Sequence, residues 1–155
     1  VIITSGATES NNIAILGYAR KNINKGKHLI TSKIEHESVL NCFKELEKEG
    51  FEVTYLDVDN EGHICLEQLE KSIRKDTILV ALMASNNEVG SNLDIEKSKE
   101  IISKFPKCVF YSDVAQAIGK IKVNYNLLDF FGWVCCGIYI GIRRNIGIRG
   151  ILRYR

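Results

Sequence analysis

Proline and long apolar runs are scarce in this 155-residue chain, and its net charge is small. The single proline, Pro106, is expected only to close a helix before a strand that starts near residue 108. No apolar run approaches the roughly 18 residues of a membrane-spanning helix, and the first residues do not have the pattern of a secretory signal. A formal net charge of +2 gives no electrostatic reason for nucleic acid or an anionic membrane as a partner. We therefore expect the chain to bind neither.

The chain also lacks the cysteine spacing of a metal or redox site. It has no C-x-x-C pair and no Cys/His ligand spacing, and an odd number of cysteines is a poor disulfide framework. The five are Cys42, Cys65, Cys108, Cys135 and Cys136. We expect no metal, a reducing compartment, and cysteines that mostly act as small buried hydrophobes. The adjacent pair 135–136 could react, although neighbouring cysteines rarely form a relaxed disulfide.

What the chain does contain is the composition of a globular domain, with 45% hydrophobic and 26% charged residues. Short apolar runs alternate with helical patterns along it. We expect strands at 1–4, 28–31, 53–56, 77–83 and 108–112, and helices from 12 onward and over 36–49, 66–73 and 94–104. This alternation predicts right-handed crossovers and an α/β fold with a mainly parallel sheet covered on both faces.

The segment 5–12, with the sequence SGATESNN, joins the first strand to the first helix. A helix N-terminus has backbone N–H groups without partners and a partial positive charge, so it favours an anion. Hydroxyls of Thr8 and Ser10 could add donors to a phosphate. The alternative is an ordinary helix start, in which Thr8 or Ser5 caps the first turn.

Polar residues follow four of the predicted strands, where an open parallel sheet binds its ligands. They are 5–10, 35–36, 86–88, Asp113 and Gln116. Each taken alone is more often a turn or a cap. Together they place an anion cradle, an imidazole, a carboxylate and amides at one edge of the sheet, which predicts a cofactor site.

At this point the sequence resembles a known family, the pyridoxal-phosphate cysteine desulfurases, a branch of the class V aminotransferases. The resemblance rests on SGATESNN (5–12), EH (35–36), NNEVG (86–90) and SDVAQAIGK (112–120), with support from EGFEVTYL (49–56). It covers about residues 1–129. It implies a three-layer α/β sandwich, namely the large domain of the aspartate aminotransferase-like, PLP-dependent transferase fold. We expect this domain to be truncated at both ends.

The resemblance also implies a role for each candidate site residue around pyridoxal 5'-phosphate. Thr8 would bind the cofactor phosphate. His36 would stack on the pyridine ring and relay protons as the catalytic residue. Asp113 would keep the pyridine nitrogen protonated. Gln116 would donate to the phenolic oxygen, and Asn87 would lie along the edge of the cofactor or substrate.

The family reaction removes sulfur from L-cysteine, giving L-alanine and an enzyme persulfide. The resemblance implies that this sulfur serves iron–sulfur cluster assembly or tRNA thiolation, through a scaffold or sulfur-acceptor protein. It also implies a homodimer and a cytoplasmic or mitochondrial location. Because Val1 already belongs to a predicted strand, any targeting segment would precede it.

Two parts of the family machinery have no counterpart in the sequence. Where the family carries its Schiff-base lysine in an SGHK stretch, this chain reads FGWVCCGIY (131–139), and Lys122 is its last lysine. Lys120 and Lys122 come too early to replace it. No cysteine matches the family's persulfide-forming residue. We therefore expect the chain as given to be catalytically inactive.

From residue 130 the chain departs from the family pattern, so we divide it into a partial PLP-binding domain (1–129) and a divergent basic tail (130–155). The basic residues of the tail are all arginine, and it has no Lys, Asp or Glu. The change indicates a shifted reading frame, a mis-spliced exon or a decayed gene. The alternative is a genuine tail that contacts RNA or an acidic partner. Alternatives for the whole chain are a non-catalytic remnant or binding module, or a fragment of a selenocysteine lyase or another class V aminotransferase.

Overall fold

The computed structural model describes residues 2–135 and 137–142. In this part of the chain, strands and helices alternate as β1 (Ile2–Thr4), α1 (Ala7–Lys21), β2 (His28–Ser32), α2 (Glu37–Lys48), β3 (Glu52–Leu56), α3 (Leu66–Ser72), β4 (Thr77–Ala81), α4 (Ile95–Ser103) and β5 (Val109–Asp113). A 3-10 turn η1 (Tyr125–Leu127) and strands β6 (Phe130–Cys135) and β7 (Gly137–Ile142) follow.

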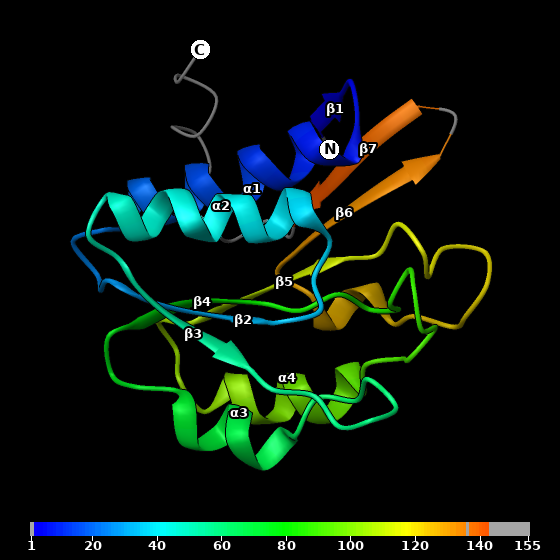
Figure 1. Ribbon diagram of the computed structural model, residues 1–155. Coiled ribbons are helices and arrows are strands. Elements are labelled where there is room, and N and C mark those ends of the chain that lie inside the picture. Colours follow the sequence, from blue (N-terminus) through cyan, green and yellow to red (C-terminus); the bar gives the residue numbers. More distant parts are fainter. Residues whose placement is uncertain (1, 136, 143–155) are drawn as a thin grey trace.

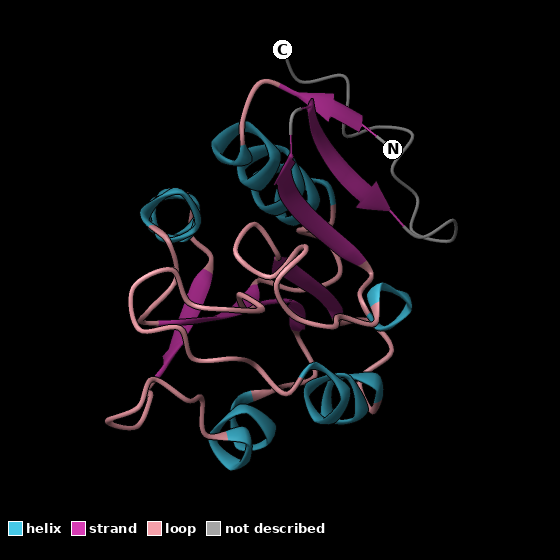
Figure 2. Cartoon of the chain, turned by 90° about the vertical axis from the view of Figure 1, so that its right-hand side faces the viewer, coloured by secondary structure: helices cyan, strands magenta, loops and turns pink. Residues whose placement is uncertain are grey.

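The strands form one seven-stranded sheet in the order β1-β7-β6-β5-β4-β2-β3. Five neighbouring strands, from β3 across to β6, run parallel, and β7 is antiparallel to both of its neighbours. Helices cover the sheet on both sides, with α1 and α2 on one face and α3 and α4 on the other (Figures 1 and 2). The predicted mainly parallel α/β sandwich is confirmed.

The central strands are rich in apolar residues because both of their faces are buried. All five residues of β2, β4 and β5 are buried. Consecutive side chains point to opposite faces, so that Leu79 packs in the cluster under α1 and α2, whereas Val80 packs in the cluster with α3 and α4. Two hydrophobic cores therefore share one sheet.

The helix ends follow the local sequence. Asp94 precedes α4 and its Oδ1 accepts a hydrogen bond from the Lys97 N–H at 3.0 Å, as predicted for an N-cap. At the end of α2, Gly50 has a positive φ of 88°. Its N–H donates to the Glu47 carbonyl, and the Phe51 N–H donates to the Leu46 carbonyl. This pair of bonds is the Schellman motif, which ends the helix.

The division that the sequence predicts at residue 130 coincides with the start of β6. This strand pairs in parallel with β5, in a register that sets Asp113 opposite Gly132. Strand β7 then pairs with both β6 and β1. The first part of the predicted tail thus contributes two strands to the sheet, and residues 143–155 lie outside the described part of the chain.

Candidate functional site

The carboxyl ends of the parallel strands meet at a pocket of about 400 Å³, called here the strand-end pocket. It is lined by Ala7, His36, Met83, Asn87, Asp113, Ala115 and Gln116. These residues come from the start of α1, the loop before α2, the loop after β4, the end of β5 and the loop after β5. Four of the five predicted site residues are therefore brought together, although they lie far apart in the sequence.

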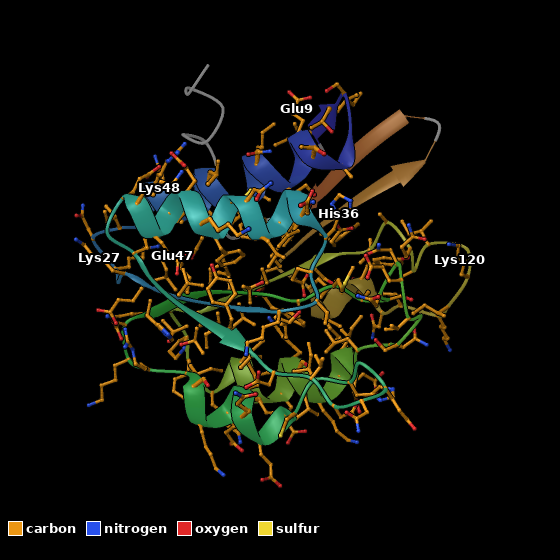
Figure 3. All side chains as sticks on the ribbon, in the orientation of Figure 1. Glu9, Lys27, His36, Glu47, Lys48 and Lys120 are labelled. Atoms are coloured by element: carbon orange, nitrogen blue, oxygen red, sulfur yellow. The ribbon has the colours of Figure 1, made fainter. Side chains whose placement is uncertain are left out.

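His36 is exposed and precedes α2 as its N-cap (Figure 3). Its Nδ1 accepts a hydrogen bond from the Ser38 N–H at 3.1 Å and lies 2.8 Å from the Ser38 hydroxyl. Because Nδ1 serves as an acceptor, a neutral imidazole carries its proton on Nε2. The ring is fixed on one side and accessible on the other.

Asp113 ends β5 and is 7% exposed. Its Oδ1 accepts from the Ala115 N–H at 2.9 Å, and its Oδ2 accepts from Asn11 Nδ2 at 3.1 Å. No cationic side chain is paired with it among the described residues. The pocket therefore contains an anchored carboxylate that could pair with a cationic group of a ligand.

Thr8 is the one predicted site residue that does not line the strand-end pocket. It is exposed in the first turn of α1, next to Ala7, which does line it. The helix starts after Gly6 and has no side-chain cap. The alternative that Thr8 or Ser5 caps the helix is therefore wrong, and α1 begins at the edge of the pocket without a side-chain cap in the described structure.

Asn87 and Gln116 supply amides to the pocket from two different loops. Asn87 is exposed on the loop after β4. The Gln116 Oε1 accepts from Lys120 Nζ at 2.8 Å, so that Gln116 would offer a ligand its Nε2–H donors. Lys120 itself lies on the loop that follows β5 (Figure 3).

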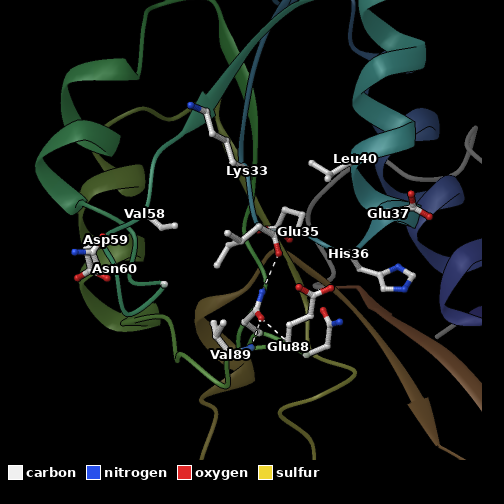
Figure 4. Close-up of a pocket in the computed structure, with 14 residues that line it drawn as sticks. Lys33, Glu35, His36, Glu37, Leu40, Val58, Asp59, Asn60, Glu88 and Val89 are labelled. Carbon is white, nitrogen blue, oxygen red and sulfur yellow. Dashed lines mark hydrogen bonds between the residues drawn. The ribbon is translucent and has the colours of Figure 1, made fainter.

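Two further side chains join the loop that carries His36 to the loop that carries Asn87. The Glu35 Oε1 accepts from the Ser32 hydroxyl at 2.6 Å and from the Met83 N–H at 3.0 Å. Asn86 donates from Nδ2 to the Ile34 carbonyl at 2.9 Å (Figure 4). The sequence placed both residues at strand ends but gave no sign that they hold these two loops together.

Burial raises the pKa of the Glu35 carboxyl to about 8, and the nearby charge of Asp113 adds to this effect. The hydrogen bonds from Ser32 and Met83 act in the opposite direction but do not cancel the effect of burial. Glu35 also lines a second pocket of about 610 Å³, which adjoins the first at His36 and Asn87 (Figure 4). At neutral pH this carboxyl therefore carries a proton.

Sequence reasoning missed three buried residues behind the strand-end pocket, Asn11, Ser38 and Tyr111. Asn11 donates to both the Asp113 carboxylate and the Ser38 hydroxyl, and it accepts from the Tyr111 hydroxyl. Asn11 belongs to the SGATESNN motif, but a single sequence does not tell which of its two asparagines faces the sheet.

The described part of the chain contains no lysine in the strand-end pocket, no metal-ligand cluster and no membrane-spanning helix. No lysine lines the described strand-end pocket. Among the residues that the structure describes, no set of three or more His, Cys, Asp or Glu side chains is placed to hold a metal ion, and no helix is long and apolar enough to cross a membrane.

The structure describes the side chains of three cysteines. Cys42 and Cys108 are buried free thiols, and burial raises the pKa of each to about 12. They are buried hydrophobes as predicted, whereas Cys65 is exposed. Cys136 lies outside the described residues, and nothing is described of the Cys135 side chain.

Comparison with known proteins identifies the family. A family model described as aminotransferase class-V matches residues 1–133. The chain belongs to this family. The family was predicted from four short motifs, and the match to most of the chain confirms it.

Individual relatives are cysteine desulfurases. The chain is 53% identical over 124 residues to the cysteine desulfurase IscS of Neisseria meningitidis serogroup A, a match that covers 80% of this chain and 30% of that protein. The solved structure of a NifS-like protein has a TM-score of 0.89 and 35% identity, and covers 94% of this chain and 42% of that one. The structure of SspA in complex with cysteine has a TM-score of 0.79 and 38% identity, and covers 85% of this chain and 38% of that one.

This class-V aminotransferase chain therefore spans about 30% of the length of the curated relatives that it matches. The likeness confirms the recognised resemblance to cysteine desulfurases and the fold that it implies. It covers the strands and helices that carry every residue of the strand-end pocket.

Proposed function

We propose that this chain is the cofactor-binding core of a cysteine desulfurase and binds pyridoxal 5'-phosphate in the strand-end pocket. The observation that carries the proposal is the meeting of His36 and Asp113 at one pocket beside the start of α1. These two residues come from loops after different strands. If His36 and Asp113 only capped a helix or formed a turn, nothing would favour their lining the same 400 Å³ pocket.

The residues present fit the cofactor by their chemistry. Its phosphate is an anion, and the start of α1 has no side-chain cap and carries the exposed Thr8 hydroxyl. Its pyridine nitrogen is a base, and Asp113 is a buried carboxylate with no cationic partner among the described residues. Its ring is flat, and the exposed imidazole of His36 offers a flat face.

Each side chain then has a distinct task. Thr8 and the first-turn N–H groups of α1 would hold the phosphate. Asp113 would hold a proton at the ring nitrogen. Gln116 would donate from Nε2 to the phenolic oxygen, and Asn87 would lie at the ligand's edge. The cofactor, when bound, supplies an electron sink to a carbon next to an amino group.

His36 can move a proton at only one of its nitrogens in this arrangement. Its Nδ1 is occupied by the Ser38 N–H, so proton exchange with a ligand would take place at Nε2. A catalytic role for His36 therefore requires the proton to pass through the exposed side of the ring.

We extend the proposal to the activity of the whole protein, which membership of the family suggests. Its reaction would remove sulfur from L-cysteine, giving L-alanine and a persulfide for iron–sulfur cluster assembly or tRNA thiolation. The similar SspA structure holds cysteine, which supports this substrate. A sulfur-acceptor protein, a second copy of the chain and a cytoplasmic or mitochondrial location belong to the same proposal.

The chain as given would bind the cofactor without a covalent link. It has no lysine after Lys122, and no lysine lines the described pocket. This sequence feature favours a second candidate function, a binding module that holds pyridoxal phosphate but does not turn over cysteine. Within the same family, the alternative is that the chain is a fragment of a selenocysteine lyase or of another class V aminotransferase.

The test is a titration of the chain with pyridoxal 5'-phosphate, followed by absorbance. We expect binding that Asp113→Asn weakens about tenfold or more, with a changed spectrum, because a neutral amide cannot hold the proton on the ring nitrogen. Asp76→Asn, at the opposite end of the sheet, is the control and should bind like the unaltered chain. No binding, or equal binding by Asp113→Asn, would overturn the proposal.

Treatment of the complex with borohydride tests whether the link is covalent. We expect no lysine to carry the reduced cofactor. A reduced adduct mapped to Lys120 or Lys122 would contradict the non-covalent mode of binding. It would not contradict the proposed binding site.

A further inference from the structure

Asn11 is a fully buried amide at the back of the strand-end pocket. Its Nδ2 donates to Asp113 Oδ2 at 3.1 Å and to the Ser38 hydroxyl at 2.8 Å. Its Oδ1 accepts from the Tyr111 hydroxyl. Three side chains from β5 and the start of α2 therefore converge on one residue of α1.

The Asp113 carboxylate and the Tyr111 hydroxyl together fix which way the Asn11 amide faces. Burial holds the pKa of Tyr111 well above its ordinary value, so the hydroxyl keeps its proton and donates. With the amide turned over, Oδ1 would face the Asp113 carboxylate and two oxygen acceptors would repel each other. The observed orientation is thus the one in which each group has a partner of opposite polarity.

Gly132 on β6 leaves space for this arrangement. A Cβ at this position would lie 2.6 Å from the Tyr111 hydroxyl oxygen and 3.5 Å from Asn11 Oδ1. Any side chain at 132 would displace the hydroxyl, because the aromatic ring of Tyr111 is buried in the core and has little room to move.

Asn11 is also linked to the imidazole of the pocket. The Ser38 hydroxyl that accepts from Asn11 lies 2.8 Å from His36 Nδ1, and the Ser38 N–H donates to the same nitrogen. One buried amide therefore contacts the Asp113 carboxylate directly and, for the imidazole, the Ser38 hydroxyl beside it.

We propose that Asn11 is a positioning residue that holds Asp113 and, through Ser38, His36 at fixed places, so that one flat cationic ring can meet both. The ligand class is the protonated pyridine ring of the cofactor, and in this respect the inference rests on the proposed function. The positions of the two side chains in the protein alone do not depend on that function.

The first test needs no cofactor and measures hydrogen exchange of the Ala115 N–H, which donates to Asp113 Oδ1. In Asn11→Ala this amide should lose at least tenfold protection, because Asp113 has lost its second anchor. The Phe51 N–H, which donates to Leu46 at the far end of α2, should change little. A merely structural effect of the substitution would instead lower protection at both amides.

The matched control is Asn12→Ala, the same substitution at the neighbouring residue of the same helix. The Asn12 Nδ2 donates to the Thr8 carbonyl within the helix and makes no described contact with Asp113 or Ser38. It should leave the protection of Ala115 within about twofold of the unaltered chain. Equal loss in the two variants would overturn the inference.

Tyr111→Phe is the second variant and applies if Asn11→Ala does not fold. It keeps the buried ring and removes only the hydroxyl that orients Asn11, so it too should lower the protection of Ala115. If Asn11→Ala does fold, the double variant should be no worse than Asn11→Ala alone, because Tyr111 acts through Asn11. Additive losses would contradict the mechanism.

Cofactor affinity separates this inference from the proposed function. We expect Asn11→Ala to weaken pyridoxal 5'-phosphate binding about tenfold and Asn12→Ala to have less than a twofold effect. Binding that is equal in both variants would overturn the inference and leave the proposed function standing. A chain that binds no cofactor but loses Ala115 protection selectively in Asn11→Ala would overturn the proposed function and support the positioning role.

Discussion

At the scale of single residues, the site depends on buried polar groups, whose hydrogen bonds offset the cost of burial to different extents. Glu35 is 5% exposed and accepts two hydrogen bonds, yet burial raises its pKa to about 8. The ordinary pKa of a glutamate side chain is 4.5. Between these two values the folded protein holds a proton that the unfolded chain releases, so stability falls as the pH rises through this window.

Replacing Glu35 with glutamine should remove this dependence. The amide oxygen can still accept from Ser32 and Met83, and no charge has to be buried. We expect Glu35→Gln to resemble the unaltered chain near pH 5 and to be more stable above pH 8, by on the order of 4 kcal/mol at most. Urea unfolding at a series of pH values measures this. The control is Glu37→Gln, an exposed glutamate two residues on, and the same pH dependence in Glu35→Gln and the unaltered chain would refute the assignment.

At the scale of elements, each helix is placed by its ends and by the loop that joins it to the sheet. Helix α2 has His36, which is also a site residue, as its N-cap, and it is ended before Gly50 by two backbone hydrogen bonds. The same helix packs against α1, which carries Asn11. The position of the imidazole relative to Asn11 is therefore set by how these two helices start and pack.

Gly50 tests how α2 is ended. Its φ of 88° favours glycine, and a Cβ there would have no heavy atom within 4 Å. Gly50→Ala should therefore cost only backbone strain, about 1 kcal/mol of unfolding free energy. Gly50→Asn should lose less, because asparagine tolerates this conformation better. Urea denaturation of the two variants measures the difference, and equal losses would show that the strain is not conformational.

At the scale of the whole molecule, the loops at the two ends of the sheet have different structural roles. The carboxyl ends of the strands carry the strand-end pocket, whereas at the amino ends the loops before β2 and β4 approach each other closely. Gly26, before β2, would place a Cβ 2.1 Å from the Asp76 carbonyl oxygen, before β4. Since this oxygen belongs to the backbone, a side chain at position 26 requires the two loops to move apart.

Gly26→Ala should therefore destabilise the entire domain, by about 3 kcal/mol or more. The central strands β2 and β4 pair directly, so separating their entry loops weakens the middle of the sheet. Thermal unfolding followed by circular dichroism should show a lower midpoint in a single transition. Lys25→Ala, at an exposed neighbour, is the control, and a similar midpoint for the two variants would show that the loops yield easily.

The sequence predicted much of this architecture from local signals. The apolar runs of β2, β4 and β5, the Asp94 cap and the stop at Gly50 are local, because they depend on burial on two faces and on backbone bonds within one turn. Four residues of the pocket were also found from the sequence, since the carboxyl ends of parallel strands always meet at one edge.

By itself, then, the sequence determined the alternation of strands and helices, the family and the polar residues at the strand ends. Only the tertiary structure decided that Asn11 rather than Asn12 faces Asp113, that Gly132 leaves room for the Tyr111 hydroxyl, and that Glu35 is buried deeply enough to hold a proton. The physical reason is that orientation, close approach and desolvation depend on residues up to about a hundred positions away, and local pattern contains no information about such neighbours.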